Sequence, residues 1–186
     1  MIIGLVGYIG AGKTDAAEIL VKEHGFKKNS FGKAVREEAI GRGLPIDRGS
    51  LQKLGYDLRQ EFGEEVLARR IIKELDLSGE NNYVIEGFRS AGDILPFKKL
   101  SSFILVWIEV PFEKRCKRIL ARGREGDPKT REQFKRADEI DRGIVESGYH
   151  QNTDECLKFV DITIDNSGSI LELDFQIKKL VGEIKC

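Results

Sequence analysis

The residues best suited to chemistry stand near the start of the chain, in the segment Gly7-Tyr8-Ile9-Gly10-Ala11-Gly12-Lys13-Thr14. It reads G-x-x-x-x-G-K-T, follows the apolar run 2–6 and precedes a stretch of helical spacing at 13–24. A glycine loop between a buried strand and a helix N-terminus points backbone N–H groups at a polyphosphate. Lys13 adds a positive charge, and the Thr14 hydroxyl is a ligand for Mg²⁺. The segment therefore predicts a phosphate-binding loop, with nucleotide contacts from Gly7, Gly10, Ala11, Gly12, Lys13 and Thr14.

The composition favours one soluble domain. The chain has 186 residues, and its 31 Lys+Arg balance its 31 Asp+Glu, so no general attraction to nucleic acid or to a membrane is expected. Its three cysteines are an odd number without a C-x-x-C pair, which indicates reduced thiols and no cysteine metal site. No apolar run approaches the roughly 20 residues that span a bilayer, and no signal peptide is evident. We expect a cytoplasmic protein.

The positioning elements alternate between strands and helices. The apolar runs predict strands at 2–6, 26–31, 83–86, 103–108 and 159–164. Helical spacing is seen at 13–24, 50–60, 64–75 and 111–121, and again after Ser169. Strands that alternate with helices predict an α/β protein with a five-stranded parallel sheet. Residues 33–77 then form a helical insertion, whereas the charged, glycine-punctuated segment 122–150 is more typical of a mobile element than of core.

Several classes of phosphate-loop protein can be set aside. A GTPase needs an N-K-x-D motif, which the chain lacks, and its D-x-x-G match at Asp76 precedes the third strand instead of following it. A motor ATPase needs two acids after an apolar strand, but Ile85-Glu86 supplies one. These comparisons favour a small kinase.

Further segments resemble the adenylate-kinase-like family of small-molecule kinases. Ser30-Phe31-Gly32-Lys33-Ala34-Val35-Arg36 is similar to its S-T-G-D-M-L-R segment, and Glu86-Gly87-Phe88-Arg89 to its D-G-F-P-R segment. The stretch from Val110 to Arg122 resembles its lid-proximal helix. Segment 161–169 is similar to the C-terminal part of dephospho-CoA kinases, and segment 126–139 to a less characterised group of archaeal and bacterial kinase-like proteins.

The resemblance implies a P-loop three-layer α/β/α fold with strand order 2-3-1-4-5, ATP as donor and Mg²⁺ as cofactor. The core would be 1–32, 82–121 and 159–186, with an acceptor-binding insertion at 33–77 and a lid at 122–150. It implies catalytic roles for Lys13, Glu86, Arg89, Arg118 and Arg122, acceptor binding by Arg36 and Arg89, Mg²⁺ at Thr14 and Glu86, and an adenine-side loop at Asn166 and Gly168. Arg136 and Arg142 are further lid candidates.

The charge pattern agrees with phosphoryl transfer. Between Lys114 and Arg136, ten basic residues stand against three acidic ones, a local charge of about +7 in a neutral chain. Such a segment can close over ATP and exclude water, and arginine suits phosphate because its planar guanidinium holds two oxygens.

The identity of the acceptor depends on whether the protein supplies a general base. A nucleoside monophosphate presents an ionised phosphate and needs none, whereas dephospho-CoA presents a hydroxyl whose proton must be taken. In dephospho-CoA kinases the base is an aspartate after the second strand, but Ser30 and Gly32 stand at the matching positions, and Glu86 would have to substitute. We therefore expect a nucleoside monophosphate kinase, with dephospho-CoA or another hydroxyl acceptor as the alternative. A regulatory ATPase without an acceptor is the third reading. The base, the sugar and the oligomeric state stay open.

Overall fold

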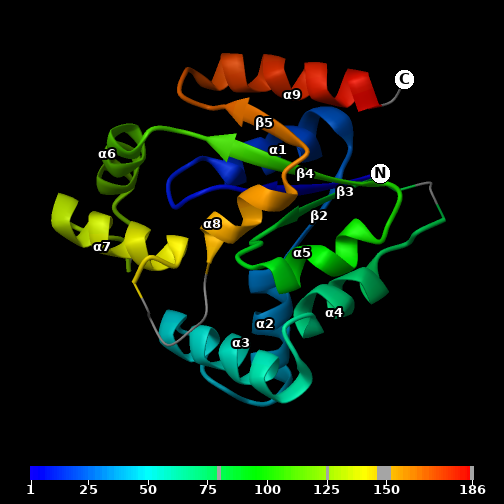
Figure 1. Cartoon of the computed structure of the whole chain (residues 1–186), viewed down its shortest axis with the longest axis vertical. Coiled ribbons are helices and arrows are strands. Elements are labelled where there is room, and N and C mark those ends of the chain that lie inside the picture. The colour runs from blue at the N-terminus through cyan, green and yellow to red at the C-terminus, as the bar shows by residue number, and fades with distance from the viewer. Residues whose placement is uncertain (79–80, 125, 146–151, 185–186) are drawn as a thin grey trace.

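The structure, a computed structural model, describes residues 1–78, 81–124, 126–145 and 152–184 (Figure 1). Its elements are β1 (Ile2–Val6), α1 (Lys13–His24), β2 (Lys27–Ser30), α2 (Phe31–Gly41), α3 (Arg48–Phe62), α4 (Val66–Glu74), β3 (Tyr83–Glu86), α5 (Ala91–Lys98), β4 (Phe103–Glu109), α6 (Phe112–Arg122), α7 (Arg131–Arg142), α8 (Thr153–Cys156), the 3₁₀ turn η1 (Leu157–Phe159), β5 (Ile162–Asp165) and α9 (Ile170–Ile184).

The strands pair in parallel in the order β2-β3-β1-β4-β5, as predicted. β1 is central and fully buried, so the loop that leaves its carboxyl end opens at the middle of the sheet edge. Ligands of open α/β sheets bind at that edge, where the strand order reverses. The sheet therefore places the phosphate-binding loop where a nucleotide site is expected.

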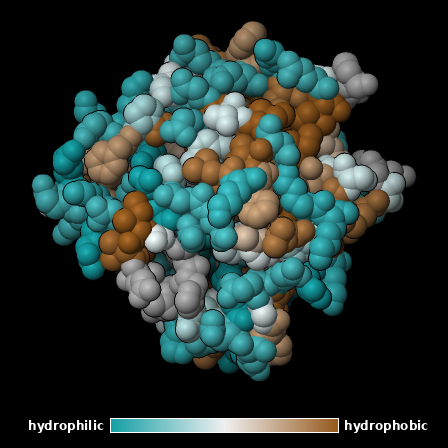
Figure 2. All heavy atoms as spheres, viewed as in Figure 1, coloured by the Kyte–Doolittle hydropathy of each residue, from teal (hydrophilic) through white to brown (hydrophobic). Residues whose placement is uncertain are grey.

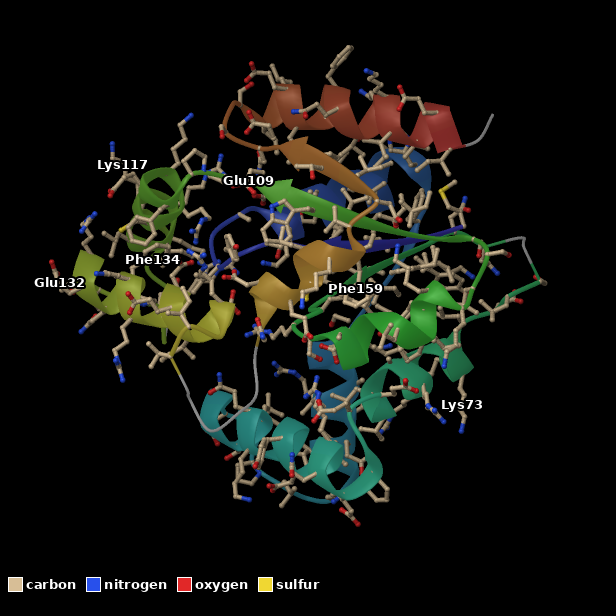
Figure 3. All side chains as sticks on the ribbon, viewed as in Figure 1. Lys73, Glu109, Lys117, Glu132, Phe134 and Phe159 are labelled. Carbon is tan, nitrogen blue, oxygen red and sulfur yellow. The ribbon has the colours of Figure 1, made fainter. Side chains whose placement is uncertain are left out.

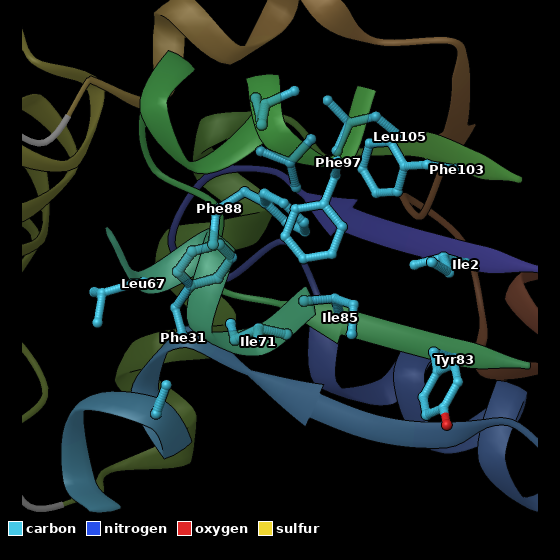
Figure 4. Close-up of a cluster of buried hydrophobic side chains, with 14 of the residues drawn as sticks. Ile2, Phe31, Leu67, Ile71, Tyr83, Ile85, Phe88, Phe97, Phe103 and Leu105 are labelled. Atoms are coloured by element: carbon cyan, nitrogen blue, oxygen red, sulfur yellow. The ribbon is translucent and has the colours of Figure 1, made fainter. Parts of the chain in front are cut away.

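Helices cover both faces of the sheet. On one face, α1 and α9 pack over Ile3, Leu5, Val106 and other strand residues. On the other face, α2, α4 and α5 enclose a core that is rich in phenylalanine (Figure 4). In that core the Phe88 ring lies 5.0 Å from Phe31 and 5.3 Å from Phe97, centroid to centroid. Such contacts are typical of well-packed aromatic cores, and they hold the segment after β3 against the sheet.

The helical insertion is continuous with the second of these cores. Leu54 and Leu58 of α3 and Leu67 and Ile71 of α4 belong to the same buried cluster as the strands. Helices α2 and α3 begin at capping side chains: Ser30 Oγ accepts from the Lys33 amide at 3.1 Å, and Asp47 Oδ1 accepts from the Ser50 amide at 3.1 Å. In Figure 1 α3 lies at the far end of the molecule from α9.

Several details differ from the sequence expectations. The strand expected at 159–164 is β5 at Ile162–Asp165, because Phe159 and Val160 reach the core from the preceding turn. Helix α5 was not predicted. Helix α7 lies inside the segment expected to be mobile, and its Phe134 is fully buried. Residues 146–150 of that expected lid lie outside the described residues, as does residue 125.

On the face drawn in Figure 2, hydrophilic side chains predominate and hydrophobic residues form smaller groups among them. Among the described residues, no helix is both long and apolar enough to cross a membrane.

Candidate functional site

The phosphate-binding loop has the backbone geometry that its glycines predict. Gly10 and Gly12 have φ angles of 82° and 88°, in the left-handed region that favours glycine. A Cβ on Gly12 would lie 2.3 Å from Nδ2 of Asn166, so a side chain at this position would meet both strain and a clash. Position 12 of the loop thus has room for backbone only.

Lys13 lies at the centre of the loop. Its ammonium donates hydrogen bonds to the backbone oxygens of Gly7, at 2.5 Å, and of Tyr8, at 3.0 Å. Burial lowers the pKa of Lys13 to about 8; among the neighbouring charges, the Asp141 carboxylate opposes this effect and Arg89 adds to it. A bound phosphate would stabilise the charged form of this ammonium, because its negative charge compensates for the hydration that burial removes.

The loop after β5 supports the phosphate-binding loop from the other side. Asn166 is buried and donates from Nδ2 to the Ala11 carbonyl at 2.8 Å. Arg118 of α6 donates to the Asn166 carbonyl at 2.8 Å, and Lys114 to the Ser167 carbonyl at 2.7 Å. The predicted adenine-side residues Asn166 and Gly168 therefore adjoin the loop, with the Asn166 amide holding the loop backbone itself.

A cleft of about 1200 Å³ opens over this loop. One wall is the loop with the start of α1, a second is the segment after β3 with Gln52 of α3, and a third comes from α6, α7 and the turn between them. Among the predicted site residues, those that line it are Gly7, Gly10, Ala11, Gly12, Lys13, Thr14, Arg89, Arg118, Arg122, Gly168, Asn166 and Arg136. Its described lining contains six basic and three acidic side chains, which suits a polyphosphate.

Two predicted residues lie elsewhere. Arg36 is exposed on α2 and is absent from the cleft lining. Glu86, at the end of β3, pairs with Lys28 at 2.6 Å and also lies behind the lining residues. Its carboxylate still acts on the Lys13 ammonium electrostatically. The acceptor and Mg²⁺ roles of these two side chains remain predictions.

Arg89 is held in the cleft wall by its backbone. Its amide donates to Oδ2 of Asp93 at 2.9 Å, and Asp93, fully buried, also accepts from Arg59 of α3 at 2.9 Å. The Arg89 guanidinium donates to Oδ1 of Asp141 on α7 at 3.1 Å. The predicted acceptor arginine thus connects the insertion to the expected lid.

The sequence analysis overlooked the residues that attach α7. Arg115 of α6 is buried and forms a two-armed ion pair with Asp138 of α7, one arm measuring 3.3 Å. It also donates to the backbone oxygens of Val110, at 3.0 Å, and of Ile9, at 3.1 Å. Phe134 packs beside it between α6 and α7 (Figure 3). The sequence carried two signals for this helix. Thr130 followed three positions later by Gln133 is a helix-capping pattern, and the apolar Phe134 stands four positions before the acidic Asp138.

A second attachment uses Tyr8 of the phosphate-binding loop. The Tyr8 hydroxyl donates to Asp154 at 2.6 Å, and Arg142, at the end of α7, donates to the same carboxylate at 3.1 Å. The guanidinium carbons of Arg115 and Arg142 each lie 4.9 Å from the centre of the Tyr8 ring. Arg142, a lid candidate, therefore holds α7 in place and does not line the cleft.

The other lid arginines face the cleft. Arg122 binds Asp127 through two hydrogen bonds of 2.9 and 2.6 Å, and this contact lowers the pKa of Asp127. Arg136 lines the cleft and has no ion pair with any described residue. Its guanidinium is thus available to a bound anion.

Several known proteins are similar to this chain in sequence or in fold. Residues 6–135 match the family model described as "AAA domain". The chain is 32% identical to the "UPF0200 protein TK1334" of Thermococcus kodakarensis, over 99% of this chain and 98% of that protein. It is 30% identical to the "UPF0200 protein MJ1399" of Methanocaldococcus jannaschii, over 99% and 90%. A solved shikimate kinase from Acinetobacter baumannii, in complex with shikimate, has the same fold at a TM-score of 0.58 with 18% identity, over 98% and 93% of the two chains.

Proposed function

The chain belongs to the UPF0200 family and carries an AAA-type P-loop domain, and we propose that it transfers the γ-phosphoryl group of ATP to a small nucleotide acceptor. The observation that carries this proposal is the shared cleft in which Lys13 of the loop and Arg89 of the opposite wall both stand. Phosphoryl transfer requires positioning and charge neutralisation more than covalent help, and both side chains supply these.

The donor would bind with its phosphates on the loop backbone and on Lys13, and with Arg118, Arg122 and Arg136 beside the transferring group. Thr14 lines the cleft and offers the hydroxyl that P-loop proteins use for Mg²⁺. No group of three metal-binding side chains occurs among the described residues, which suits an ion held mainly by phosphates and water. When bound, Mg²⁺ would neutralise phosphate charge; Glu86 would act on it through water.

Two classes of acceptor fit the cleft. A nucleoside monophosphate is supported by the basic lining and by Arg89, which can bind its phosphate. A hydroxyl compound such as dephospho-CoA is supported by the Asp141 carboxylate, because a hydroxyl needs a proton acceptor. In both cases the helical insertion would hold the acceptor, with Gln52 of α3 in the wall.

The proposal is tested by ADP formation with ATP, Mg²⁺ and a panel of ribo- and deoxynucleoside monophosphates, nucleosides and dephospho-CoA, above a blank without acceptor. We expect turnover with one compound, its abolition in Arg89→Ala, and retained ATP binding in that variant. Arg69→Ala removes an arginine whose exposed pair with Glu65 lies outside the cleft lining, and it should keep wild-type turnover. ADP formation that no acceptor stimulates would instead support a regulatory ATPase.

A further inference from the structure

Asp141 is a carboxylate in the cleft that the sequence motifs did not reveal. It lies near the end of α7, lines the cleft together with Ala137 and Ile140, and its side chain is 13% exposed. Its Oδ1 accepts from Arg89 at 3.1 Å, and its charge acts on the ammonium of Lys13. A carboxylate therefore contacts one of the two cations expected to flank the transferring phosphate, shares the cleft with the other and acts on it electrostatically.

Asp141 is held firmly because the residues around it on α7 are attached. One turn earlier, Asp138 forms the buried pair with Arg115, which also bonds to the Ile9 carbonyl of the loop. The next residue, Arg142, binds Asp154 and stacks on Tyr8 of the same loop. Both attachments end on the phosphate-binding loop, so Asp141 keeps a fixed position relative to the nucleotide. Reactive groups on rigid, well-supported elements are positioned more accurately than groups on loops.

The charge of Asp141 bears on the choice of acceptor. Arg89, the side chain expected to clamp an acceptor phosphate, already pairs with this carboxylate. A monophosphate would have to displace Asp141 or approach it as a like charge, and like charges at contact distance repel. An uncharged hydroxyl meets no such repulsion and gains a proton acceptor.

Glu86 is the less suitable base. Its carboxylate pairs with Lys28 at 2.6 Å and does not line the cleft, whereas Asp141 does. Ser30 and Gly32, at the positions where dephospho-CoA kinases have their base, carry no carboxylate. Asp141 would reach the same reaction centre from α7.

We propose that Asp141 is the general base of the transfer and that the acceptor presents a hydroxyl group; this rests on the proposed kinase function. The acceptor oxygen forms a bond to the γ-phosphorus while the bond from that phosphorus to the β–γ bridging oxygen breaks. The hydroxyl proton passes to the Asp141 carboxylate, ADP leaves with the bond electrons, and the protonated aspartate later returns the proton to water. The products are ADP, a phosphate monoester and one proton.

The test compares wild-type protein with Asp141→Asn, Asp141→Glu and Glu139→Gln. The last variant also removes a carboxylate from α7, but one that lies outside the cleft lining. Each protein is assayed against the hydroxyl compounds and the monophosphates of the panel, and its ATP dissociation constant is measured separately. General base catalysis is worth about 10²–10⁴-fold.

We expect wild-type transfer to a hydroxyl compound. Asp141→Asn should lower kcat at least about 100-fold while ATP still binds, Asp141→Glu should restore part of kcat, and Glu139→Gln should match wild type. If Asp141→Asn keeps kcat within about threefold on a hydroxyl acceptor, Asp141 is not the base. If a monophosphate is the substrate and Asp141→Asn lowers its KM by removing a competing carboxylate, the inference fails while the kinase function stands. If no acceptor of either class is phosphorylated, the function and the inference fail together.

Discussion

The side-chain amide of Asn166 donates to the backbone carbonyl of Ala11 at 2.8 Å, so a residue 155 positions away holds the phosphate-binding loop in shape. Both groups are buried. In Asn166→Ala the Ala11 carbonyl loses its partner, and an unsatisfied buried group costs about 1–3 kcal/mol. We expect weaker ATP binding and a lower Tm, by calorimetry. Leu171→Ala, which trims an exposed side chain of α9, is the control and should leave both unchanged. Wild-type ATP affinity in Asn166→Ala would show that this bond does not shape the loop.

The close approach of Gly12 and Asn166 can also be tested by a substitution at Gly12. Gly12→Ala places a Cβ 2.3 Å from Nδ2 of Asn166 at a φ of 88°, so the loop must move and ATP binding should be lost. Gly25→Ala is matched in conformation, with a φ of 72°, but its Cβ would meet no atom within 4 Å and it ends α1 away from the cleft. That variant should lose about 1 kcal/mol of stability yet bind ATP normally. Equal effects of both substitutions on ATP affinity would contradict the steric argument.

The buried pair between Arg115 and Asp138 should dominate the stability of α7. Asp138→Asn leaves a buried guanidinium without its counter-charge, which typically costs about 3–5 kcal/mol. For a chain of this length we expect Tm to fall by about 6–20 °C. Arg131→Ala breaks the ion pair with Glu113, in which both side chains are more than half exposed, and should leave Tm nearly unchanged because solvent screens such pairs. Thermal unfolding of both variants tests this claim. If Asp138→Asn lowers Tm as little as Arg131→Ala does, the Arg115–Asp138 pair does not dominate the stability of α7.

The pH dependence of ATP binding should report on Lys13. Burial lowers its pKa to about 8 in the free protein, and a bound polyphosphate favours the charged form, so binding must raise that pKa. Affinity should therefore be highest below about pH 8 and decline as the pH rises above it, by up to about tenfold per pH unit. Titration calorimetry from about pH 7 to about pH 9.5 measures this trend. In Lys13→Arg the decline should vanish, because arginine stays charged. If the ATP affinity of wild-type protein does not change with pH, the Lys13 ammonium does not bind the polyphosphate.

The sequence predicted those features of the fold that local patterns determine. The segment from Gly7 to Thr14 carried enough information to place the loop, β1 and α1. The apolar runs predicted a five-stranded parallel sheet, and the family resemblance predicted its observed strand order. The boundaries of β5 were displaced because Phe159 and Val160 are apolar for packing reasons and not for strand pairing. Helix α7 was missed because only Phe134 on it is a buried apolar residue.

The candidate site was predictable where side chains act locally and not where they meet across the fold. Arg89 was expected after the end of a strand and Arg118 on the lid-proximal helix, and both line the cleft. Asp141 could not be found in this way, because its partner Arg89 lies 52 positions earlier and only the docking of α7 brings them together. Arg115 appeared as one of ten basic residues in a charged segment, and its burial depends on Asp138 and on the loop carbonyl of Ile9. Residue type alone does not separate such a structural arginine from a catalytic one.

Transfer of the γ-phosphoryl group of ATP to an organic acceptor can be observed directly by phosphorus NMR of a reaction of the protein with ATP, Mg²⁺ and the acceptor panel. We expect a new phosphate ester or diphosphate resonance that grows in step with ADP and is absent in Lys13→Ala. Inorganic phosphate in amounts equal to ADP, with no new organic phosphate in any mixture, would contradict this transfer and identify a nucleotide hydrolase.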